Sequence, residues 1–225
     1  MCGRYLLSTS AEIIAGLFQA EACSEFEPRY NIAPTQQIPV VLQGQDQRSL
    51  RSMRWGLTPH WAKAKIGPRG GVQLPDFINA RSETAANKPS FRDAIRQRRC
   101  LVPADGFYEW KKTTEGKQAH LIRFLKPQVF AMAAIWEAWI SPEGQARQGV
   151  CILTTAGNTE LRALHDRMPV ILHPDRYAVW LNPRNSPENL TGLLQPLPDG
   201  FLQVQAVSNR VNRTQEDDAD LLLPL

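Results

Sequence analysis

The chain has 225 residues, of which 43% are hydrophobic and 21% are charged. This size and composition allow a substantial buried core, which excludes a disordered protein and a small scaffold held together by disulfides. The formal net charge of +4 permits an anionic partner such as a nucleic acid but does not require one.

The N-terminal half begins with a predicted helix over residues 9–18. Thr9 and Glu12 have the spacing of a capping box at its start. One face of this helix carries the apolar residues Ile13, Ile14, Leu17 and Phe18. A second helix is expected directly after Pro89, with Ser90 as its candidate cap. The second helix covers residues 90–100, and strand-like runs precede it at 38–43 and 49–57.

The C-terminal half is dominated by predicted strands that are joined in hairpins. One hairpin turns near Glu115 and Gly116, and another turns between Pro142 and Gly144. Strands that follow one another through hairpins predict an antiparallel, α+β architecture. No repeat or long linker divides the chain, so we expect one domain over residues 1–225. The strands are expected over 100–110, 119–125, 129–140, 150–156 and 202–208, and short helices over 158–167, 174–181 and 186–194.

Cysteine and histidine usage bears on cofactors and on the cellular compartment. The four cysteines, at positions 2, 23, 100 and 151, form no CxxC pair, and the four histidines supply no ligand spacing. The N-terminus lacks the pattern of a signal peptide, and no segment approaches the ~18 uninterrupted apolar residues of a membrane span. We therefore expect a reduced, cytoplasmic protein without a metal, a small-molecule cofactor or a membrane contact.

Several polar residues occupy places that an ordinary core would not give them. Each has a structural interpretation: Cys2 can be a frayed terminus, Asn79 can satisfy a turn, and Glu109 can pair with a lysine of its hairpin. Taken singly, none identifies a function. They stand in the segments "MCGRY", "RYNIAP", "WGLTPHW", "INARSET", "PADGFYEW", "ILTTA", "LHDRMPVIL" and "AVSNRVN".

In this order and spacing, the segments resemble the SRAP (SOS response-associated peptidase) family. The resemblance covers nearly the whole chain, and "MCGR", "NAR.E", "DGFYEW" and "HDRMP" are its most specific marks. It implies a single α+β SRAP domain with a mostly antiparallel, curved and barrel-like β core and short flanking helices.

The resemblance implies a covalent reaction with abasic sites in single-stranded DNA. Removal of Met1, by the protein itself, would free the α-amine of Cys2 beside its thiol. The amine attacks the C1′ aldehyde of the opened sugar, and the thiol then closes a thiazolidine ring. An internal cysteine could not do this, because its nitrogen belongs to a peptide bond. This requirement explains why the cysteine stands at the N-terminus.

The family pattern also implies roles for four catalytic residues. Glu109 would move protons at the Cys2 amine and at the sugar ring oxygen, support the removal of Met1, and make the crosslink reversible. His165 would protonate the ring oxygen and help to open the sugar. Asn79 would orient the Cys2 amine and the sugar through hydrogen bonds.

Further residues are expected at the DNA interface, where binding would weaken with salt. Trp61 would stack against a neighbouring base, Asn31 would support the N-terminus, Thr154 would be a polar residue of the site, and Ser208 would line the far side of the groove. Planar guanidinium groups suit phosphate oxygens. Three arginines would contact the phosphates beside the lesion: Arg4, Arg81 and Arg167.

The resemblance completes the functional hypothesis and leaves two alternatives open. We expect a monomer that binds single-stranded DNA containing abasic sites, located in the cytoplasm and at the nucleoid when bound. One alternative is a thiol peptidase that cleaves other peptides, with Cys2 activated by His165 or Glu109. The other is a non-covalent single-strand binder. The acidic residues of the tail are expected to face away from DNA: Glu216, Asp217, Asp218 and Asp220.

Overall fold

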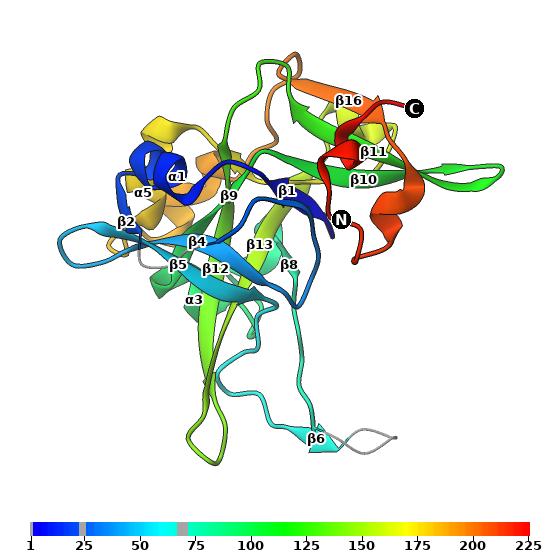
Figure 1. Ribbon diagram of the computed structural model, residues 1–225. Helices are drawn as coiled ribbons and strands as arrows, with labels where there is room; N and C mark the ends of the chain where they lie inside the picture. Colours follow the sequence, from blue (N-terminus) through cyan, green and yellow to red (C-terminus); the bar gives the residue numbers. More distant parts are fainter. Residues whose placement is uncertain (1, 23–25, 67–71) are drawn as a thin grey trace.

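A computed structural model describes residues 2–22, 26–66 and 72–225, with two β-sheets at its centre and short helices around them (Figure 1). The first sheet has five strands, all antiparallel, in the order β16-β11-β10-β1-β3. Its strands are β1 (Tyr5–Leu7), β3 (Arg29–Ile32), β10 (Gly106–Thr113), β11 (Gly116–Phe124) and β16 (Leu202–Ala206).

The second sheet is larger and carries the order β14-β13-β12-β9-β4-β5-β2, with β8 beside β13 and β15 beside β12. Most of its pairings are antiparallel, whereas β13 pairs in parallel with β5 and β8, and β2 with β5. The predicted α+β fold with a mostly antiparallel core is therefore confirmed. The bounds are β2 (Ala20–Ala22), β4 (Gln37–Gln43), β5 (Arg48–Trp55), β8 (Asn79–Arg81), β9 (Arg99–Ala104), β12 (Phe130–Ile140), β13 (Ala146–Ala156), β14 (Arg167–Pro169) and β15 (Ile171–Leu172), and a separate small sheet pairs β6 (Lys65–Ile66) with β7 (Val72–Gln73).

Both predicted hairpins are present. Thr113 pairs with Gly116 at the end of the β10–β11 hairpin, and Ile140 pairs with Ala146 at the end of the β12–β13 hairpin. Gly144 in the second turn has a φ of 83°, in the left-handed region that glycine adopts without strain. The end of the β10–β11 hairpin projects well beyond the sheet (Figure 1). The residues at this end therefore do not pack in the core.

Helix α1 (Ala11–Phe18) forms where predicted, but its start differs from the predicted capping box. The residue that caps it is Ser10, whose side chain makes no capping bond. The Thr9 hydroxyl donates instead to Asp105 Oδ1 at 2.9 Å, and Glu12 accepts from the Ser10 hydroxyl at 3.0 Å. A tertiary partner thus replaces the local capping interaction. Of the predicted apolar face, Ile14 and Phe18 are buried, whereas Ile13 and Leu17 are exposed.

The other helices are short and lie near the predicted places. Ser90 is not a cap, because α3 begins after Phe91 without a side-chain capping bond. Asn158 caps α4 by accepting from the Leu161 N–H at 3.1 Å. The segment expected as a helix over 186–194 is a 3-10 helix. The elements are α2 (Ser82–Ala85), α3 (Arg92–Gln97), α4 (Thr159–Arg162), η1 (Pro174–Arg176), α5 (Tyr177–Leu181), η2 (Pro187–Leu193), η3 (Asn209–Asn212) and η4 (Ala219–Leu222).

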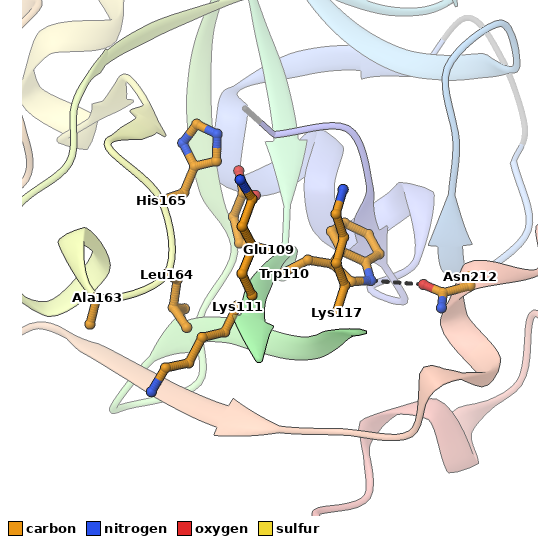
Figure 2. Close-up of a pocket in the computed structure, with 9 residues that line it drawn as sticks. Glu109, Trp110, Lys111, Lys117, Ala163, Leu164, His165 and Asn212 are labelled. Carbon is orange, nitrogen blue, oxygen red and sulfur yellow. Dashed lines mark hydrogen bonds between the residues drawn. The ribbon is translucent and has the colours of Figure 1, made fainter. Parts of the chain in front are cut away.

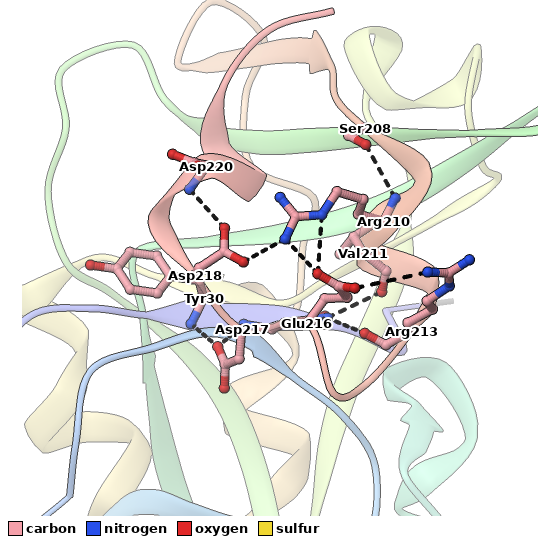
Figure 3. A network of polar contacts seen from close by, with 10 residues as sticks. Tyr30, Ser208, Arg210, Val211, Arg213, Glu216, Asp217, Asp218 and Asp220 are labelled. Atoms are coloured by element: carbon pink, nitrogen blue, oxygen red, sulfur yellow. Dashed lines mark hydrogen bonds and ion pairs between the residues drawn. The ribbon is translucent and has the colours of Figure 1, made fainter.

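The C-terminal segment is fastened to strand β3, beside the N-terminal strand (Figure 3). Asp217 Oδ1 accepts from the backbone N–H groups of Tyr30 and Asn31 at 2.6 and 2.9 Å, and its carboxylate pairs with Arg29. The fully buried Asn31 donates back to three carbonyl oxygens of the tail, those of Val211, Arg213 and Glu216. The acidic tail is therefore occupied by contacts within the protein.

Removing this anchor should cost measurable stability. We expect Asn31→Ala to lower the free energy of unfolding by about 3 kcal/mol, because partly buried carbonyl groups lose their donor. Asn87→Ala, at an exposed position, should stay within about 0.5 kcal/mol of the parent. Urea titrations at a constant m-value test this. Equal midpoints for the two variants would contradict the anchoring role.

Candidate active site

The N-terminal cysteine is held inside the protein. Cys2 is fully buried, and its carbonyl oxygen accepts a hydrogen bond of 2.7 Å from the side-chain amide of Asn79 on β8. Its thiol lies 3.8 Å from the carbonyl oxygen of Arg4. Burial raises the pKa of the Cys2 thiol well above its usual range, and the nearby charge of Glu109 raises it further. The thiol is thus protonated at neutral pH. Met1, whose removal is predicted, lies outside the described residues.

Glu109 and His165 line one cavity of about 670 Å³ (Figure 2). Glu109 lies on β10 and is only 3% exposed, so its carboxylate faces the cavity from the core side. Its charge is also one cause of the raised pKa of the Cys2 thiol, so the two groups interact electrostatically. Glu109 therefore connects the buried terminus to an opening on the surface.

The ring of His165 is oriented by the backbone that follows α4. Its Nδ1 accepts from the Arg167 N–H at 2.9 Å, which in the neutral imidazole leaves the proton on Nε2. The Asp166 carboxylate also lies 2.9 Å from Nδ1, and this carboxylate is 82% exposed. These contacts fix the orientation of the ring at the wall of the cavity.

Arg4 lies between the N-terminal strand and the C-terminal segment. Its Nη1 donates to Asn31 Oδ1 at 2.8 Å and to the carbonyl of Val211 at 2.7 Å. Partial burial lowers the pKa of its guanidinium. The structure thus brings Asn31 and Arg4 together, and both tie the terminus to the tail.

A second arginine is fixed by two partners. Arg167 on β14 makes a bidentate ion pair with Glu83, at 2.6 and 2.8 Å, and donates to the carbonyl of Thr154 at 2.5 Å. The hydroxyl of the buried Thr154 donates to the carbonyl of Ala80, next to Asn79. Glu83 belongs to the segment "INARSET", together with Asn79 and Arg81, and its partner Arg167 is 84 residues away along the chain.

The remaining predicted DNA contacts are more dispersed. Arg81 is exposed at the end of β8, and Trp61 is 51% exposed, with its indole N–H donating to the carbonyl of Pro89. Ser208 caps η3 by accepting from the Arg210 N–H. Arg210 itself is paired with Glu216 and Asp218. Among the described residues that line the cavity of Glu109, none of these four is present: Arg81, Trp61, Ser208 and Arg210.

Several residues that line this cavity have no role in the family pattern described above. They come from the β10–β11 hairpin, from the end of α4 and from η3. Strand alternation could have identified one of them, Lys111, because a residue two positions after Glu109 lies on the same face of the strand. These residues are Trp110, Lys111, Lys112, Lys117, Ala163, Leu164 and Asn212.

The Glu83–Arg167 pair should appear in the pH dependence of stability. The Arg167 guanidinium holds the pKa of Glu83 below its ordinary value of 4.5, so the folded state binds fewer protons than the unfolded state near that pH. The contribution is present above about pH 4.5 and is lost as the pH falls through the folded-state pKa. Glu83 is half exposed, so we expect Glu83→Gln to cost no more than about 1 kcal/mol at pH 7 and less at pH 3. Urea midpoints at both pH values test this; a cost that grows on acidification would contradict it.

Metal-binding clusters and membrane-spanning helices are both absent from the described part of the chain. Within residues 2–22, 26–66 and 72–225, no cluster of three or more His, Cys, Asp or Glu side chains could hold a metal ion. No helix among them is long and apolar enough to cross a membrane. Cys100 and Cys151 are free and buried, and Cys23 lies outside the described residues.

Comparison with known proteins places this geometry in context. Residues 1–214 match the family model described as SOS response associated peptidase (SRAP). The abasic site processing protein YoqW of Bacillus subtilis is 37% identical over 228 residues, and the match covers 99% of each chain. The abasic site processing protein YedK of Escherichia coli is 28% identical and matches over the full length of both chains. A crystal structure of a Bacteroides thetaiotaomicron protein shares the fold, with a TM-score of 0.86 at 23% identity over the full length of both chains.

Proposed function

Because this chain belongs to the SRAP family, we propose that it processes abasic sites in single-stranded DNA through a covalent bond to Cys2. Relatives that match along their whole length are named abasic site processing proteins. The single observation that carries the proposal is that Glu109, whose charge acts on the buried Cys2 thiol, lines one cavity together with His165.

The reaction begins with the peptide bond between Met1 and Cys2. Its hydrolysis, which Glu109 assists as the nearby carboxylate, consumes one water and frees the α-amine of Cys2. An α-amine has an ordinary pKa near ~8, so a useful fraction is neutral at pH 7 and can attack an aldehyde. The Asn79 amide, bonded to the Cys2 carbonyl, fixes the direction in which that amine points.

The covalent steps release one water in total. His165 gives a proton to the sugar ring oxygen as the bond between that oxygen and C1′ breaks, and the C1′ hydroxyl loses its proton to water, which leaves the C1′ aldehyde. The amine adds to C1′, and loss of water leaves a C=N bond. The thiol then adds across this bond: sulfur bonds to C1′, and the thiol proton passes to nitrogen, with Glu109 as the carrier. Reversal runs through the same groups in the opposite order.

Burial of the thiol favours a reaction in which the amine attacks first. It disfavours the alternative of a general thiol peptidase. A peptidase of that kind attacks with a thiolate, whose formation a low pKa promotes. Burial and the Glu109 charge raise the pKa of Cys2 instead. In the proposed reaction the amine attacks first, and the thiol reacts with an adjacent imine carbon, so a standing thiolate is not required.

A denaturing gel tests the proposal. The protein is mixed with a single-stranded oligonucleotide that carries one abasic site and, separately, with the intact oligonucleotide. We expect a heat- and detergent-stable shifted band with the abasic strand alone. A stable band with both strands, or binding without any stable band, would contradict the proposal; the second outcome would indicate a non-covalent binder.

A further inference from the structure

The cavity at Glu109 does not end at the proposed catalytic groups. It continues along the β10–β11 hairpin, where its wall includes Lys111, Lys112 and Lys117 (Figure 2). Lys111 follows Glu109 by two strand residues, about 7 Å along β10, on the same face. The opening beside the catalytic carboxylate is therefore bordered by ammonium groups.

Folding alone gives no reason for this arrangement of charge. Lys112 and Lys117 are directly opposed across the hairpin, and like charges in that position destabilise a strand pair. All three lysines are exposed. A bound anion would offset the repulsion between them.

The hairpin lysines differ from the arginines around the site. Arg167 is neutralised by Glu83, and Arg210 by Glu216 and Asp218. None of the three lysines forms an ion pair with any residue in the part of the chain that the structure describes. The hairpin segment from 111 to 117 holds three lysines and one acidic residue, Glu115.

We infer that this lysine hairpin, residues 111–117, binds the backbone phosphates of the DNA strand on one side of the abasic site. The inference rests on the proposed function, since it assumes that the abasic sugar enters the cavity at Glu109. The Trp110 indole N–H donates to Asn212 Oδ1 at 2.7 Å and joins the hairpin to η3 beside the cavity. A strand that leaves the cavity along the hairpin would meet ammonium groups on both of its faces, Lys111 on the face of Glu109 and the Lys112–Lys117 pair on the other.

The test uses oligonucleotides with a tetrahydrofuran abasic analogue, which lacks the aldehyde and binds only reversibly. One carries nucleotides only 5′ of the analogue, and the other only 3′. The test variant is K111Q/K112Q/K117Q in the full chain. The control variant, R51Q/K126Q/R184Q, removes the same charge from exposed positions outside this cavity.

The quantity to be measured is the salt dependence of the binding constant. Each phosphate contact on a single strand adds about 0.7 to the slope of log K against log salt concentration. The hairpin variant should lose about 2 from that slope with one of the two oligonucleotides and keep the wild-type slope with the other. Its affinity deficit should then shrink more than about tenfold between 50 and 200 mM salt. K111R/K112R/K117R, which keeps the charge, should bind as wild type does.

The other outcomes overturn the inference. They are an unchanged slope, an equal loss with both oligonucleotides, an equal loss in the control variant, or no binding of either oligonucleotide by the wild type. Failure of the proposed function is recognised in a separate experiment. In that case the wild type, mixed with an oligonucleotide that carries a true abasic site, gives no stable shifted band on a denaturing gel. A wild type that crosslinks while the hairpin variant binds normally would reject only the hairpin.

Discussion

Replacing Cys2 with alanine should abolish the heat-stable adduct with abasic DNA, lowering its yield at least about 100-fold to background, because the variant lacks the sulfur that closes the ring. Its N-terminal amine can still form an imine, but an imine hydrolyses readily. Borohydride, which reduces imines, should therefore recover an adduct from the alanine variant once Met1 has been removed. Reversible DNA binding should remain.

A matched variant separates this effect from the general loss of a buried thiol. Cys100 is also free and buried, on β9 in the second sheet. Cys100→Ala should retain adduct formation near the wild-type rate, as measured on denaturing gels over time. A Cys2→Ala protein that formed the heat-stable adduct as well as Cys100→Ala would show that another group makes the bond.

Replacing Glu109 with glutamine should slow crosslinking by about 10²–10⁴-fold, the usual contribution of a positioned proton carrier. The substitution keeps the size of a side chain that is only 3% exposed, so the fold should survive. It removes the charge that helps to raise the pKa of Cys2, so the thiol should become more acidic while the reaction becomes slower. Single-turnover time courses and the thiol's pH-dependent alkylation measure the two effects.

Glu143→Gln is the control for this substitution. Glu143 is exposed in the turn of the β12–β13 hairpin and does not line the cavity of Glu109. Its replacement should leave the single-turnover rate within about twofold of wild type, since an exposed charge is screened by solvent. A Glu109→Gln protein that crosslinks at the wild-type rate would remove Glu109 from the mechanism.

Strands and hairpins could be predicted because their signals are local. Alternation of apolar residues and turn glycines is contained within a few residues, and the turns near Gly116 and Gly144 formed as expected. The helix starts were harder. Thr9 has a capping pattern, yet its hydroxyl bonds to Asp105, which is 96 residues away and invisible to a local rule.

The same distinction applies to the site. The resemblance to a family supplied Cys2, Asn79, Glu109 and His165; the structure shows a hydrogen bond between Asn79 and Cys2, and it places Glu109 and His165 in one cavity. Neither spacing nor composition could reveal that Asp217 holds the backbone of Tyr30 and Asn31, since these contacts span more than 180 residues.

The partners of charged residues were the least predictable feature. Arg4 and Arg167 both carry hydrogen bonds within the protein, to Asn31 and to Glu83. The hairpin lysines were expected only as possible partners of Glu109, whereas Lys111 lines the same cavity as that residue. An ion pair depends on which surfaces the fold brings together, and side-chain type alone does not determine this.

Intact-mass measurement of the purified crosslink, with and without borohydride, tests the central claim most directly. The account predicts the mass of the chain without Met1 plus the abasic oligonucleotide minus one water, with peptide mapping to Cys2. Borohydride should not change it, because a closed thiazolidine has no C=N bond to reduce. A crosslink that retains Met1, maps to another residue, or gains two hydrogens on reduction would contradict the account.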